Sequence, residues 1–217
     1  MIKTFDYKNG EIKITYNEAP VVKDYKCDWK KYQIGIKTFP VSLNYRLGVE
    51  LKIQKGGRIC YGMLGVQVQP DEEINSMKID VAFTKGNSIR YYDSCLYNDD
   101  RVYKGLPEEY VESVIRKVTS EILKKDKYPQ YKILFEDAAN CEVGSSPMIY
   151  ALISEIIINI ISENACEKIM DMDIQSFTNQ FAKNLIRADF IRDTIYGETL
   201  DLARERNCRR KGQEAIK

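Results

Sequence analysis

The chain contains no histidine among its 217 residues. This excludes Ser–His and Cys–His catalysis, the usual zinc hydrolase ligand sets and the commonest general base. The glycine-rich phosphate-binding motifs G-x-x-x-x-G-K-[ST] and G-x-G-x-x-G are also missing. We therefore expect a protein that is not an enzyme and that uses no cofactor, no nucleotide and no metal. Two carboxylate pairs, Asp99–Asp100 and Glu136–Asp137, are the remaining candidates for chemistry, and surface pairs of this kind are usually solvated.

An excess of charge of either sign is lacking too. Lysine and arginine number 33 against 32 acidic residues, so the net charge is +1. No overall field then favours nucleic acid or a membrane, and any basic contact surface must be local. The start of the chain, from Met1, lacks the apolar segment of a signal peptide. The isoleucine-rich run at 148–161 is too short and too interrupted to span a membrane. We expect a cytoplasmic protein without a membrane segment.

Cysteine occurs six times but never in C-x-x-C spacing. Without a secretory signal, this scatter favours free packing thiols over a disulfide set or a zinc site. The residues concerned are Cys27, Cys60, Cys95, Cys141, Cys166 and Cys208.

Alternation of apolar and polar residues is the clearest structural signal. It runs through 43–54, 64–69 and 77–83 and predicts strands with one buried face. Shorter strands are expected at 11–16 and 29–38, and residues 1–10 are expected to form a short leader. An amphipathic helix is predicted from Pro107, with apolar residues at helical spacing as far as Leu123.

The stretch Tyr131–Ile161 predicts a strand, a loop and a buried helix in succession. Residues 131–135 are short, apolar and rich in β-formers. Residues 136–144 are polar and are expected to form the loop. Ser145 or Ser146 is expected to cap the following helix, with Pro147 in its first turn. That helix is apolar on nearly every face, which predicts a position in the core.

Between two alternating runs lies the segment Gln54–Gly62, with glycines at 56 and 57. Paired glycines permit positive φ and therefore a tight hairpin. The turn would carry Lys55 and Arg58 into solvent. It is either a solvated turn or a contact point for phosphate.

After Asn164 the sequence changes character. Ile174, Phe177, Phe181 and Leu185 keep a helical period, and this stripe could cover the domain or a partner. The end is locally basic, which is typical either of a solvated helix end or of a secondary contact with nucleic acid. The basic residues are Arg204, Arg206, Arg209, Arg210 and Lys211.

Four stretches, in this order, resemble domain IV of elongation factor G. Residues 12–18 (IKITYNE) resemble the strand that leads into the domain, and residues 54–62 (QKGGRICYG) its glycine hairpin. Residues 105–111 (GLPEEYV) are similar to the opening of its first helix. Residues 141–146 (CEVGSS) are similar to the loop before its second helix. The similarity covers about residues 11–163.

The resemblance implies an α+β fold like ribosomal protein S5 domain 2, with a sheet of about four strands and two helices on one face. It divides the chain into an elongation factor G domain IV-like domain at 1–163, with its core at 11–163, and a helical C-terminal extension at 164–217. It also implies a non-enzymatic protein that binds the ribosome or structured RNA through two adjacent loop tips. The contact residues so implied are Lys55, Gly56, Gly57, Arg58, Tyr61, Asn140, Cys141, Glu142, Ser145 and Ser146.

The chain departs from the family at two loop positions. Cys141 stands where the family has histidine, and Gly144 where it has aspartate. The GTPase domain is missing as well, so the fold could be inherited without the function. The alternative is a protein–protein interaction module or a homo-oligomer that uses the C-terminal helices. A reactive thiol at Cys141, near a helix start, is a further possibility.

Overall fold

The computed structural model describes residues 1–7, 10–18, 27–55, 57–86, 89–96 and 101–182. Its main feature is an eight-stranded mixed sheet in the order β1-β2-β5-β6-β10-β7-β3, with β8 paired to β10. The strands are β1 (Ile2–Tyr7), β2 (Gly10–Tyr16), β3 (Asp28–Gly35), β5 (Tyr45–Lys55), β6 (Arg58–Pro70), β7 (Ser76–Phe83), β8 (Val102–Lys104) and β10 (Tyr131–Cys141). A small parallel pair joins β4 (Thr38–Phe39) to β9 (Tyr128–Pro129).

The predicted fold class, a sheet of about four strands with two helices, is wrong. The sheet has eight strands instead of about four, and the two helices beyond α1 and α2 in the described residues lie within 164–217, where a helical extension was predicted. The extra strands lie mainly at the edges: β1 extends the sheet through antiparallel pairing with β2, and β3 through pairing with β7. Edge strands are largely exposed and have little apolar alternation, which is why residues 1–10 were expected to form a leader.

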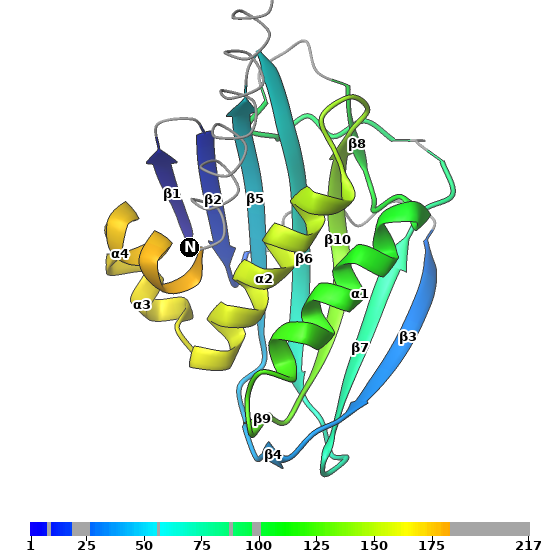
Figure 1. Cartoon of the computed structure of the whole chain (residues 1–217), viewed down its shortest axis with the longest axis vertical. Coiled ribbons are helices and arrows are strands. Elements are labelled where there is room, and N and C mark those ends of the chain that lie inside the picture. Colours follow the sequence, from blue (N-terminus) through cyan, green and yellow to red (C-terminus); the bar gives the residue numbers. More distant parts are fainter. Residues whose placement is uncertain (8–9, 19–26, 56, 87–88, 97–100, 183–217) are drawn as a thin grey trace, which may run out of the picture.

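Two long helices cover one face of the sheet (Figure 1): α1 (Glu108–Ile122) and α2 (Pro147–Glu163). Both predicted helices are confirmed. Helix α1 turns its apolar stripe, including Val111, Val114 and Val118, toward the sheet. Helix α2 is buried along most of its length. The apolar faces of β5, β6, β7 and β10 complete this core.

Strand β10 continues well beyond the predicted strand at 131–135. A register shift between Phe135 and Asp137 lets it run on to Cys141. Residues 132–135 pair with β7 in parallel, and residues 139–141 pair with β8 in the antiparallel direction. The polar residue Asn140 is accommodated because its amide donates to the carbonyl oxygens of Gly105 (2.9 Å) and Tyr103 (3.4 Å). Residues 136–141, predicted to be loop, are therefore strand.

The chain after Asn164 packs against the sheet as far as it is described. Helices α3 (Cys166–Asp171) and α4 (Ile174–Phe181) lie next to β1 (Figure 1). Phe177 is fully buried and stacks on Phe5, with ring centroids 4.4 Å apart. Phe181 is buried in the same core.

The opposite face of the sheet, which we call the open face, carries a second and smaller core. The segment 91–96 covers its upper part, so that Tyr91 and Leu96 pack with Tyr61, Met63 and neighbouring residues. None of the helices in the described part of the chain is long and apolar enough to cross a membrane.

Candidate nucleic-acid interface

The first predicted tip is the hairpin between β5 and β6. Lys55 pairs with Arg58, as expected for a hairpin that closes between these two residues. Gly57 has φ of +80°, a conformation that glycine adopts without strain. Arg58 is exposed at the base of the turn. Gly56 and the side chain of Lys55 lie outside what the structure describes.

The second predicted tip is the loop between β10 and α2. Ser146 occupies the N-cap position of α2, but neither predicted serine cap forms. The Ser145 hydroxyl is used elsewhere: it donates to the Tyr61 carbonyl (2.8 Å) and accepts from the Cys141 N–H (2.8 Å). The Ser146 carbonyl accepts from the N–H groups of Ile149 and Tyr150. Ser145 thus ties the loop to a strand instead of capping the helix.

The two tips lie side by side at one end of the sheet. The Tyr61 N–H donates to the Gly144 carbonyl at 3.1 Å, next to the Ser145 bond to the same residue of β6. A Cβ on Gly144 would lie 2.6 Å from the Ile59 carbonyl oxygen, so this contact requires glycine. The close approach between the loop and the hairpin therefore explains why residue 144 is glycine, where the elongation factor G family has aspartate.

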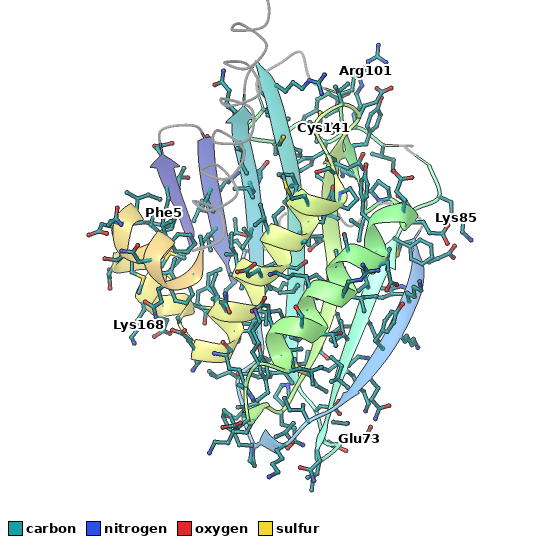
Figure 2. The ribbon with its side chains drawn as sticks, viewed as in Figure 1. Phe5, Glu73, Lys85, Arg101, Cys141 and Lys168 are labelled. Carbon is teal, nitrogen blue, oxygen red and sulfur yellow. The ribbon has the colours of Figure 1, made fainter. Side chains whose placement is uncertain are left out.

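The side chains presented at this end are apolar and of both charges: Glu108 and Glu109 at the start of α1 line a hollow with Cys141 and Glu142. Val143 is 92% exposed at the tip of the loop. Arg101 is exposed and pairs with Glu142 at 3.3 Å, and the Glu142 N–H donates to the Arg101 carbonyl. Figure 2 shows Arg101 near Cys141, at the end of the sheet opposite Glu73. Arg90 is also exposed, on the segment that bridges to β8 at Tyr103.

Three of the predicted contact residues are buried. Tyr61 is completely buried, and its hydroxyl donates to Glu50 (2.7 Å) on the open face. Burial and the neighbouring Glu50 carboxylate raise the pKa of Tyr61 well above its usual value. Asn140 is held by the two carbonyls described above, and Cys141 is 6% exposed. These three residues therefore pack beneath the two tips and are not presented on their surface. Because the Cys141 thiol is buried, it does not fit the expectation of an accessible, reactive cysteine.

Sequence reasoning missed Arg90, Arg101 and Val143. The first two lie between β7 and β10, in a region without apolar alternation. The pairing of β8 with β10 brings Arg101 next to Glu142, and Arg90 bridges to Tyr103 on the other side of β8. Val143 is a single apolar residue in a loop, which carries no signal by itself.

Several sequence predictions fall elsewhere. Some of them lie outside the described residues: Asp99, Asp100, Leu185, Cys208 and the basic residues Arg204, Arg206, Arg209, Arg210 and Lys211. Glu136 forms an ion pair with Arg46 (3.1 Å), and Asp137 is buried. No cluster of three metal-binding side chains occurs in the part of the chain that the structure describes. Cys27, Cys60, Cys95, Cys141 and Cys166 are free.

Comparison with known proteins adds no relative: neither a family model nor a curated protein matches this sequence. The resemblance to domain IV of elongation factor G therefore stays a prediction from the four motifs.

Proposed function

We propose that this protein is a non-enzymatic RNA-binding protein that contacts its target through the surface formed by the two tips. We define this tip surface as Arg58, Arg90, Arg101, Glu142 and Val143. The observation that carries the proposal is the pair of hydrogen bonds from Tyr61 and Ser145, which join the hairpin and the loop into one surface. A ribosomal target, which the motif resemblance implies, belongs to the same proposal, and so does the cytoplasmic location expected from the sequence.

The charge of the tip surface fits contact with phosphate. Three of its five residues are arginines and one is a glutamate, with which Arg101 pairs at 3.3 Å. Arginine binds phosphate through a planar, bidentate set of donors. A small number of such contacts gives weak binding that depends on the salt concentration. Recognition of RNA shape and stacking on bases would have to supply the rest of the affinity.

The alternative, assembly through the C-terminal helices, has less support. Its apolar stripe would have to be available to a partner, yet Phe177 and Phe181 are buried within the chain against Phe5 and α2. In the described residues, Phe177 and Phe181 of this stripe pack into the core of the chain itself.

Sedimentation with ribosomes at low and high salt tests the proposal. We expect association at low salt that weakens as salt increases, and the Arg58→Glu variant should bind more weakly with a salt slope reduced by about one. Arg116→Glu is the matched control, because Arg116 is exposed on α1, away from the tips. Absence of binding at low salt, or equal binding by both variants, would contradict the proposal.

A further inference from the structure

A pocket of about 190 Å³ lies on the open face, over β2, β5 and β6 and beside the segment 91–96. Its floor contains Gly48, which pairs with Thr15 of β2 on one side and with Gly65 of β6 on the other. Neither glycine has a side chain to fill the space above the sheet. Lys13, Thr15, Glu50, Tyr91 and Asp93 line its sides. We call this hollow the sheet-face pocket.

One lining group has an unmet hydrogen-bonding capacity. Thr15 is only 9% exposed, and its hydroxyl has no hydrogen-bond partner. A buried hydroxyl without a partner loses the water it would bond in the unfolded chain, and this destabilises the fold. A bound polar group in the pocket would remove that cost.

A second lining group is a buried carboxylate. Glu50 is 4% exposed, and its Oε1 accepts from the Tyr61 hydroxyl (2.7 Å) and the Cys95 N–H (2.9 Å). Its Oε2 forms a longer ion pair with Lys13 at 3.6 Å. Oε1 is therefore held in a fixed position, and the Cys95 thiol also donates to this carboxylate. The Lys13 ammonium lies farther from Oε2, and a carboxylate oxygen can accept more than one donor.

The charge around the pocket favours a cation. Glu50 and Asp93 carry two negative charges, and Lys13 carries one positive charge. Glu18 also lines the pocket but is paired with the N-terminal ammonium at 2.7 Å. The remaining lining is largely apolar, from Ile2, Met63 and Tyr91, whereas the Val49 side chain packs in the core on the opposite face of the sheet. A ligand with an ammonium head and a short apolar body would satisfy both parts.

We propose that the sheet-face pocket binds a small primary ammonium compound, whose ammonium group donates to Glu50 Oε2 and to Thr15 Oγ1. The apolar body of the ligand lies against Met63 and Tyr91. None of the five tip-surface residues lines the pocket, and ligand binding is measured without RNA, so the proposal is tested separately from RNA binding.

Calorimetric titration with phenethylammonium tests the proposal, with 2-phenylethanol and 3-phenylpropionate as uncharged and anionic probes of similar shape. We expect one phenethylammonium per chain and much weaker binding of the other two probes. Thr15→Val keeps the shape and removes the hydroxyl, and it should weaken binding by roughly five- to tenfold, the usual effect of one hydrogen bond. Thr4→Val is the control. Thr4 lies on β1, on the same face of the sheet as Thr15, but it is exposed, so the affinity for phenethylammonium should not change.

Thermal unfolding of the ligand-free variants gives a second readout. Thr15→Val should unfold at a higher temperature than the parent, because it removes a buried hydroxyl without a partner. Asp93→Asn changes an exposed residue and should fold normally while weakening phenethylammonium binding. Equal binding of the ammonium and the alcohol, no binding of either, or unchanged affinity in Thr15→Val would overturn the proposal.

Discussion

At the scale of single residues, Gly144 determines how closely the two tips approach. It brings the loop before α2 against β6, where a side chain would meet the Ile59 carbonyl at 2.6 Å. A contact this short forces the backbone to move, since neither partner is the flexible end of a side chain. The same residue allows the Tyr61–Gly144 hydrogen bond.

We predict that Gly144→Ala lowers the free energy of unfolding by about 1–3 kcal/mol, as overpacking at a well-ordered site does. Urea unfolding measures the change. Gly35→Ala is the control, because no heavy atom lies within 4 Å of the added Cβ there. An unchanged urea midpoint in Gly144→Ala would show that the two segments are not in contact.

Residue-level prediction from the sequence was uneven at the tips. The glycine turn could be predicted, because paired glycines between alternating runs allow few other conformations. The burial of Tyr61 and Asn140 could not, because it depends on β8 and the segment 91–96, which have no periodic pattern. Ser145 was expected to cap a helix, but its hydroxyl has a better position between two strands.

At the scale of elements, α1 and α2 are joined by a buried ionic contact. Lys117 of α1 pairs with Glu121 (2.9 Å) and with Glu155 of α2. Burial opposes ionisation of Glu121, but hydrogen bonds from Lys124 and Lys117 outweigh it and lower the pKa of this carboxyl below 4.5.

The sign of the resulting pH dependence follows from linkage. A carboxyl whose pKa is lower in the folded state contributes stability above its unfolded pKa, and loses it as the pH falls through the folded pKa. We predict that Glu121→Gln is less stable than the parent at neutral pH, and that the difference shrinks below pH 4.5. Urea unfolding at a series of pH values measures it. A difference that stays constant down to acidic pH would contradict the assignment.

The docking of α4 is the second prediction at this scale. Phe177 is fully buried and stacked on Phe5. Phe177→Ala should cost about 3–5 kcal/mol of unfolding free energy, as for other large core truncations. Phe39→Ala is the control, because Phe39 is 39% exposed and should cost far less. Equal losses in urea unfolding would show that α4 is not part of the core.

Prediction of the elements succeeded where the periodicity was strong. The long strands and the helices α1 and α2 alternate or repeat over many residues, and burial of one face enforces that pattern. The edge strand β1 and the outer half of β10 were missed. Strand β1 has few buried residues, and β10 contains buried polar residues and a register shift that break its alternation.

At the scale of the whole molecule, one apolar core extends from β1 to α4. Ala165, Ile169, Phe177 and Phe181 belong to the same core as the sheet and α2. Chain beyond residue 163 is therefore needed to cover β1 and β2, although the motif resemblance stops there.

We predict that a chain ending at residue 163 unfolds at a much lower urea concentration than a chain ending at residue 182. The shorter chain exposes the apolar surface around Phe5 that α3 and α4 cover. Light scattering should show that it self-associates. Equal stability of the two truncated chains would contradict a shared core.

The central claim is that the tips form the RNA contact, and site-specific crosslinking tests it most directly. A photoreactive benzoylphenylalanine is placed at Val143 on the tip surface or at Ile74, which is 73% exposed in the turn after Asp71 and before β7. After irradiation with ribosomes at low salt, we expect crosslinks to RNA from position 143 and few from position 74. Equal yields from both positions, or crosslinks from position 74 alone, would contradict the account.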